Sequence, residues 1–248
     1  MKTIYILWLR QIKRFFRSKS RIIGSLGQPL LFLVALGFGL GPVYQKAGEG
    51  DYLQFLAPGI IAMAILFMSI FTGMEVIWDK QFGFLKETLV APVPRYQIML
   101  GRTLGGATVA IFQGAIIFAL TLALGFRPEN WALMPLSLVF IVLIAFIFAS
   151  LGTAIASLMK DMHGFQLIMN FLVMPIFFLS GAIFPLEGLP KALEIAVKID
   201  PMSYGVDGLR GSLAGLSHLG LGLDLALLSI LSLLFLILGS YFFSKIEV

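Results

Sequence analysis

The chain has 248 residues, of which 59% are hydrophobic and only 12% are charged. Soluble domains carry about 25% charged residues. A mean hydropathy of +0.97 therefore excludes a soluble enzyme, a disordered tail and a nucleic-acid-binding module. No cysteine occurs, which excludes disulfides, thiolate zinc sites and cysteine nucleophiles. The net charge of +5 then needs an explanation other than nucleic acid, and the position of the charges supplies one.

The first segment, residues 1–21, has the periodicity of an amphipathic helix. At about 100° per residue, its aliphatic and aromatic side chains, among them Trp8, fall on one face. Arg10, Arg14 and Arg17 fall on the opposite, basic face. Such a helix lies in the membrane interface. There it either anchors the chain to anionic lipid or acts as a lever that contacts a cytoplasmic partner.

Long uncharged runs follow, and each approaches the ~20 apolar residues that cross a bilayer. A charge at the bilayer centre costs at least about 2.5 kcal/mol, so runs this free of charge are informative. We expect the first run to be a retained helix rather than a signal peptide, because it reaches span length and has no obvious small-residue cleavage site. We predict six transmembrane helices, at residues 22–43, 53–77, 101–126, 131–159, 164–186 and 224–244.

The distribution of positive charge predicts the orientation of these spans. Most of the 18 Lys and Arg residues fall on the side that holds both termini. The opposite side holds Lys46, Arg127, Lys191, Lys198 and Arg210. Because Lys and Arg are in excess in cytoplasmic loops, we expect both termini in the cytoplasm of a multi-pass protein of the plasma or inner membrane.

The cytoplasmic segment 80–94 combines an apolar helical stripe with two prolines. Phe82, Leu85 and Leu89 are three and four residues apart, which favours a short helix. Pro92 and Pro94 end it, because proline cannot continue a helix and restricts the residue before it. Such a helix either transmits force or is an ordinary interfacial connector.

The external segment 187–223 is too apolar to be a fully solvated loop. Asp200 and Pro201 divide it into two short helical stretches, about 190–199 and 202–213. We expect it to lie on, or dip into, the outer leaflet as a re-entrant helical hairpin. Asp207 and Arg210 are three residues apart and are expected to pair locally.

Polar groups inside or next to the spans are few. Glu75 and Asp79, where the second span ends, are expected to be solvated; the alternative is a pair that binds a cation or couples to a partner. Gln113 and Asn170 are expected to form interhelical hydrogen bonds, with pathway lining as the alternative. Small residues predict close helix packing at Gly101, Gly105, Gly106, Gly152 and Ala156.

Catalytic and metal-binding patterns are absent from the sequence. The only two histidines are predicted on opposite sides of the membrane, and no H-E-x-x-H, G-x-S-x-G or P-loop motif occurs. The spans also lack the mid-membrane charges that ion-coupled carriers commonly use. The energy for any transport must therefore come from a partner or from a pre-existing gradient.

Several short motifs together resemble ATP-binding-cassette type-2 permeases, most closely the daunorubicin-resistance-like branch of multidrug exporters. The resemblance covers nearly the whole chain and is strongest over residues 79–113, which begin DKQFGFLKETLVAP. It recurs in FLSG at 178–181, FPL at 184–186 and DPMSYGVDGLR at 200–210. Lys80 and Gln81 depart from the Arg-Glu pair that members often carry, which weakens inference about local salt bridges.

The resemblance implies one type-2 transmembrane domain over residues 1–248. Two such permeases, identical or related, would form the transmembrane unit above two separately encoded ATPase subunits, which bind ATP and Mg. This chain would bind no cofactor and no metal itself. Segment 1–21 resembles the family's connecting helix, 80–94 its coupling segment and 187–223 its external re-entrant hairpin.

The resemblance also implies roles for particular residues. Coupling to the ATPase would involve Phe82, Phe84, Leu85, Lys86, Glu87, Leu89 and Pro92. Gating by the re-entrant segment would involve Asp200, Pro201, Tyr204, Asp207 and Arg210. The pathway between the permease halves would be lined by Gln28, Met63, Phe67, Asn170 and Phe177. We expect Asp at position 85 or 89 to uncouple ATP hydrolysis from transport without unfolding the spans.

The predicted function is ATP-driven export of an amphiphilic or hydrophobic substrate, drug-like or lipid-like, from the cytoplasm. A pathway wall of Phe, Met and Leu suits such molecules, because these side chains adapt to varied shapes. One alternative is a solitary gradient-driven carrier, which would need ionisable groups at mid-depth. The other is a non-transporting structural or regulatory membrane subunit.

Overall fold

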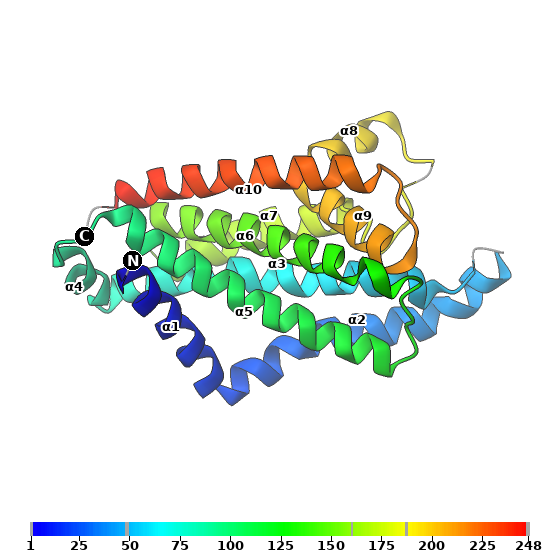
Figure 1. The fold of residues 1–248 in the computed structure, drawn as a ribbon, viewed down its shortest axis with the longest axis horizontal. Helices are drawn as coiled ribbons and strands as arrows, with labels where there is room; N and C mark the ends of the chain where they lie inside the picture. Colours follow the sequence, from blue (N-terminus) through cyan, green and yellow to red (C-terminus); the bar gives the residue numbers. More distant parts are fainter. Residues whose placement is uncertain (1, 48–49, 160, 187, 247–248) are drawn as a thin grey trace.

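The computed structural model describes residues 2–47, 50–159, 161–186 and 188–246 (Figure 1). Within these residues the chain is helical and contains no β-strand, which confirms the predicted all-α membrane class. Lys160, one of the basic residues counted on the side of the termini, and Glu187, the first residue of the predicted external segment, lie outside the described part. The helices are α1 Lys2–Arg17, α2 Lys19–Lys46, α3 Tyr52–Gln81, α4 Phe84–Val90, α5 Arg95–Ala123, η1 Trp131–Leu133, α6 Met134–Leu158, α7 Met162–Leu179, α8 Lys191–Ile199, α9 Pro201–Ala214 and α10 Leu221–Ser244.

Six helical stretches in the described residues are long and apolar enough to cross a membrane: α2, α3, α5, η1 with α6, α7 and α10. Several of these helices begin or end in charged sequence beyond the predicted apolar runs. Helical hydrogen bonds can continue past the edge of the hydrocarbon layer of a bilayer. The fifth is shorter than the predicted 164–186. It ends at Leu179, and Gly181 follows with φ +73°, a left-handed conformation that favours glycine and stops a helix.

Helix α3 is the centre of the bundle. It packs most extensively against α6, α5 and α2, and the side chains of Ile60, Ile61 and Met63 are fully buried. The outer helices α2, α7 and α10 instead expose large apolar side chains, as a lipid-facing or subunit-facing surface requires. Examples are Leu31, Phe38, Phe171, Ile230 and Leu233.

The short helices lie at opposite ends of the bundle. α1, α4 and both termini are at one end, and α8 and α9 are at the other (Figure 1). The segment between α7 and α10 is not uniformly superficial: α8 is mostly exposed, whereas α9 packs against α3, α6 and α10 and is buried along most of its length. Helix α9 therefore belongs to the core of this end.

Glycines permit the closest helix crossings, as the sequence predicted. Gly73 of α3 lies directly on the backbone of Gly152 in α6, so a Cβ at Gly73 would clash with the Gly152 carbonyl group. A Cβ at Gly101 or Gly105 of α5 would instead meet α1. These contacts fix α3 against α6 and seat α1 on α5 at backbone distance.

We expect Gly73→Ala to lower stability by about 1–3 kcal/mol, because the added methyl group meets backbone that cannot move aside. The matched control is Gly39→Ala in α2, where no atom lies within 4 Å of the new Cβ. There the change should be neutral or slightly stabilising, since alanine favours a helix by up to about 1 kcal/mol over glycine. Thermal unfolding of the two purified variants in detergent measures both effects, and equal melting temperatures would contradict the crossing.

Candidate functional site

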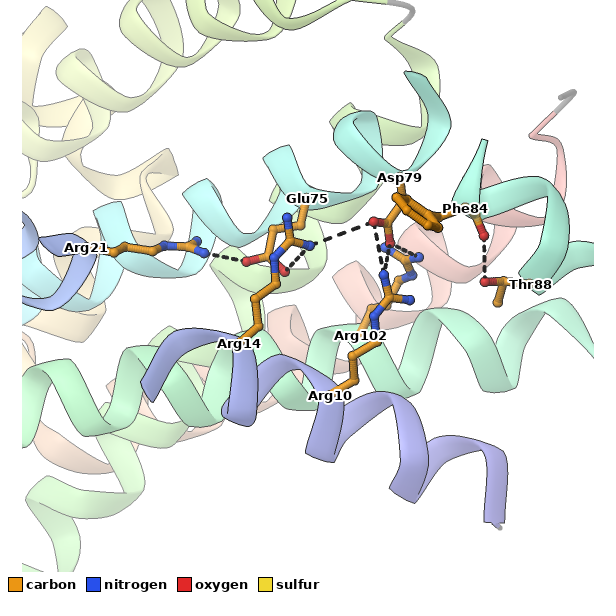
Figure 2. A network of polar contacts seen from close by, with 8 residues as sticks. All are labelled: Arg10, Arg14, Arg21, Glu75, Asp79, Phe84, Thr88 and Arg102. Atoms are coloured by element: carbon orange, nitrogen blue, oxygen red, sulfur yellow. Dashed lines mark hydrogen bonds and ion pairs between the residues drawn. The ribbon is translucent and has the colours of Figure 1, made fainter. Parts of the chain in front are cut away.

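A network of charged side chains lies at the end of the bundle that holds α1 and α4. Helix α1 packs on α5 through its buried residues Leu7, Gln11 and Phe15. This packing turns Arg10 and Arg14 toward the last turns of α3 (Figure 2).

Two carboxylates of α3 are the centre of this network. Asp79 accepts hydrogen bonds from Arg102 Nη2 at 2.6 Å and from Arg10 Nη2 at 3.2 Å. Glu75 pairs with Arg21 of α2 and lies 3.6 Å from Arg14 Nη1. Arg14 Nη1 also lies 3.7 Å from Asp79, so it links the two carboxylates.

Burial makes these pairs structurally important. Asp79 and Arg102 are 3% and 4% exposed, and Glu75 is 7% exposed. A buried charge without a partner is strongly unfavourable, so each carboxylate requires a close arginine and Arg102 requires Asp79. The four arginines come from α1, α2 and α5, so the network ties all three helices to α3.

This arrangement corrects one expectation. Glu75 and Asp79 are not solvated but buried, because α1, α2 and α5 fold over them. The basic face of α1 is divided, because Arg10 and Arg14 point into the protein while Arg17 stays exposed. On the apolar face, the Trp8 indole N–H donates to Thr108 of α5 at 3.0 Å.

A cavity of about 650 Å³ lies beside this network, between α1, α2 and α3. Three of the predicted pathway residues, Gln28, Met63 and Phe67, line it. Gln113 closes one side, where its amide donates to the Ser25 carbonyl at 3.1 Å and accepts from the Ser25 hydroxyl at 3.2 Å. The expected interhelical hydrogen bond of Gln113 is thus confirmed.

The other two predicted pathway residues do not line this cavity. Phe177 is buried, and its ring makes edge contacts with Phe32 and Phe67. Asn170 is exposed on α7 beside a separate, much smaller hollow next to Phe67. It makes no hydrogen bond within the described residues, so the interhelical bond expected for it is not present there.

Helix α4 presents a mixed surface. It begins after Gly83, whose φ is +80°, and ends at Val90 before Pro92, where the sequence predicted a stop. Leu85 is fully buried, so it holds α4 to the bundle and cannot be the surface that a partner contacts. The expectation that Asp at Leu85 would spare the fold is therefore corrected. Leu89 is half-buried, and the exposed predicted residues are Phe82, Phe84, Lys86, Glu87 and Pro92.

At the opposite end, polar side chains begin helix α9. Asp200 caps it by accepting from the Met202 N–H at 2.9 Å, and Pro201 occupies the first turn. The Tyr204 hydroxyl donates to the Lys198 carbonyl at 2.6 Å, which joins α9 to α8. Burial raises the pKa of Asp200, which lies outside the spanning helices, to about 7, although the hydrogen bonds from Met202 and Ser203 oppose that shift.

Asp207 and Arg210 are both buried but serve different partners, which corrects the expected local pair. Asp207 accepts from the backbone N–H groups of His218 and Leu219 at 2.9 and 2.8 Å, and so holds the turn before α10. Arg210 donates to the carbonyls of Phe55 and Gly181, and its guanidinium lies 3.8 Å from the centre of the Phe55 ring.

Sequence reasoning missed the charged network as a site. The available signal was a pair of acidic residues, Glu75 and Asp79, directly after an apolar run, together with the positive face of residues 1–21. Their partners are far away in sequence, so no local pattern pairs them. For a metal ion, the described residues offer no cluster of three or more His, Asp or Glu side chains.

Comparison with known proteins places this architecture in a family. A family profile described as ABC-2 type transporter matches residues 2–214. Nodulation protein J of Rhizobium leguminosarum bv. trifolii is 30% identical, over 85% of this chain and 78% of its own length. The inner membrane transport permease YadH of Escherichia coli K12 is 25% identical over 87% and 84%. The putative transport permease ycf38 of Cyanophora paradoxa is 26% identical over 85% and 73%.

Replacing Asp79 by Asn should destabilise the protein by about 3–5 kcal/mol, because it leaves the Arg102 guanidinium buried without a counter-charge. The control is Arg14→Gln: the Arg14 side chain is 37% exposed, so the loss should stay within about 1 kcal/mol. Adding Arg102→Met to Asp79→Asn should recover much of the loss. Detergent unfolding curves measure all three, and a wild-type melting temperature for Asp79→Asn alone would refute the role of the pair.

The pKa of Asp200 gives a pH prediction. The Asp200 carboxyl group stays protonated up to about pH 7 in the folded protein but only up to about pH 4 in the unfolded chain. The free energy of unfolding should therefore fall as the pH rises between those two values. Each tenfold difference in proton affinity between the folded and unfolded states changes the free energy of unfolding by about 1.4 kcal/mol. Asp200→Asn keeps the helix cap but cannot ionise, so its melting temperature should decline less over this range. Parallel profiles for the two proteins would contradict the assignment.

Proposed function

Since this chain belongs to the ABC-2 type transporter family and is a membrane permease subunit of an ABC transporter, we propose that it exports an amphiphilic or hydrophobic substrate from the cytoplasm. The observation that carries this proposal is the cavity of about 650 Å³ between α1, α2 and α3. Drug-sized ligands occupy cavities of about 300–1,000 Å³. Met63, Phe67, Phe71 and Met74 line this one, and Met and aromatic side chains adapt to varied apolar shapes.

The proposed energy source is a pair of cytoplasmic ATPase subunits, which would bind ATP and Mg. Helix α4 is the proposed contact with them. Its exposed apolar residues Phe84 and Val90 are 51% and 84% accessible and lie at the end of the bundle that holds both termini. We place this end in the cytoplasm, because most of the Lys and Arg residues gather there.

A second permease copy is the proposed partner within the membrane. The cavity is lined by residues of α1, α2 and α3 and by Gln113 of α5, all of one chain, and α2 and α7 expose large apolar side chains. A copy facing these helices would complete the pathway wall, including the exposed Asn170 and the aromatic cluster around Phe177. Lipid would cover the remaining apolar surface, as on α10.

Three observations favour this proposal over its alternatives. A solitary carrier would need ionisable groups near mid-depth of the pathway, whereas the charges around this cavity lie at its end, in the network of Glu75 and Arg21. A purely structural subunit would not need an apolar cavity of substrate size. Two relatives, YadH and ycf38, carry the names of transport permeases.

Val90→Asp should weaken contact with the ATPase and lower transport-coupled ATP hydrolysis at least about tenfold, because it puts a charge at an apolar interface. The matched control is Ile199→Asp, which changes an equally apolar side chain, 75% exposed, at the opposite end. Both variants should fold. The measurement is a mild-detergent pull-down of the tagged chain from native membranes, followed by an ATP hydrolysis assay.

A P-loop ATPase that co-purifies stoichiometrically with wild type and Ile199→Asp, but not with Val90→Asp, would support the proposal. Recovery of the wild-type chain alone in several detergents would overturn it and favour the solitary carrier. Equal recovery of the ATPase with both variants would leave export standing but remove α4 as the contact.

A further inference from the structure

A second hollow lies next to the apolar cavity at the charged end of the bundle. This hollow, of about 1,120 Å³, lies between α1, the start of α2 and the end of α3, with Phe84 of α4 in its lining. Arg14, Ser18 and Trp78 line both spaces, so the two are adjacent. Apolar side chains line much of both, and the second adds a cluster of cations from α1 and the start of α2.

The second hollow is strongly basic. Its lining includes one carboxylate, Asp79, and that group is already paired with Arg102 and Arg10. Three further cations, Lys13, Arg17 and Lys19, are exposed on its wall and make no hydrogen bond or ion pair with the described residues. A concave surface with an excess of one charge concentrates ligands of the opposite charge.

The charged network explains why this excess persists. Among the described residues, Glu75 and Asp79 are the only acidic ones that line either hollow, and both are paired with buried or half-buried arginines. Because those arginines offset the two carboxylate charges, the exposed cations set the net charge of the second hollow. The free cations therefore favour an anion, and guanidinium and ammonium groups both bind phosphate well.

From this geometry we propose that the two hollows form one binding site for an anionic amphiphile with a phosphate-bearing headgroup. The headgroup lies between Lys13, Arg17 and Lys19, and the hydrocarbon enters the cavity of Met63, Phe67 and Phe71. Trp78 lies at the junction. The inference rests on the proposed export function and names its substrate class: an anionic lipid-like molecule taken up from the leaflet that faces α1.

Trp78 provides a direct reporter, because it lines both hollows and its side chain is 44% exposed. The purified full chain, in nanodiscs of zwitterionic lipid, is titrated with phosphatidylglycerol brominated in its acyl chains. The same titration with brominated phosphatidylcholine tests the headgroup. Quenching present in wild type and absent in Trp78→Phe is the signal from this site.

We expect saturable quenching of Trp78, with phosphatidylglycerol preferred about tenfold or more over phosphatidylcholine. Both lipids carry one phosphate charge, but choline adds a cation that the excess of Lys and Arg around the second hollow repels. Lys13→Gln with Arg17→Gln should reduce the preference to less than about threefold. The charge-preserving pair Lys13→Arg with Arg17→Lys should retain it. The control Lys2→Gln with Lys245→Gln removes the same charge from exposed positions outside both hollows and should also retain it.

Equal quenching by the two lipids, or an unchanged preference in Lys13→Gln with Arg17→Gln, would overturn the proposal. Glycerol phosphate that displaces the lipid as effectively as intact phosphatidylglycerol would also overturn it, because the site would then bind a soluble anion. The assay uses no ATP and no ATPase. Its failure therefore leaves the export proposal standing, whereas loss of ATPase recruitment would not alter the lipid result.

Discussion

The structure depends on two buried carboxylates, both on α3, the central helix of the bundle. Asp79 and Glu75 follow the apolar run of α3, and that helix is packed on nearly every side. Charges in such a position must be matched, because the attraction of close partners is what offsets desolvation. The partners are arginines of α1, α2 and α5. The place of α1 against the bundle is thus set by electrostatics as well as by apolar packing.

The shape of the candidate site is a consequence of that constraint. Arg10 and Arg14 draw α1 toward α3, while α2 leaves the end of α1 and runs along α3 at an angle (Figure 1). The space left between them is the cavity and its basic extension. Arg10, Arg21 and Arg102 form ion pairs with the buried carboxylates. The remaining cations of α1, Lys13 and Arg17, are exposed and line the second hollow.

The opposite end is fixed by a different set of contacts. Helix α9 is packed against α3, α6 and α10, and its buried polar groups cap or hold neighbouring backbone. Arg210 reaches the carbonyls of Phe55 and Gly181, and Asp207 holds the turn before α10. This end is therefore held by hydrogen bonds between its own helices and turns. The other end is open and charged and presents α4.

The sequence by itself determined the membrane class, the six spans and the short helices at either end, because these follow from uncharged length, helical periodicity and proline placement. It also selected Gln28, Met63 and Phe67, which line the cavity, and predicted the close packing at Gly152. The partners of Glu75, Asp79, Asp207 and Arg210, the burial of Leu85 and the early end of α7 were decided only by tertiary structure. Charged residues that are distant in sequence form pairs only when their helices lie side by side. A local sequence pattern does not predict which face of a helix the neighbouring helices will cover.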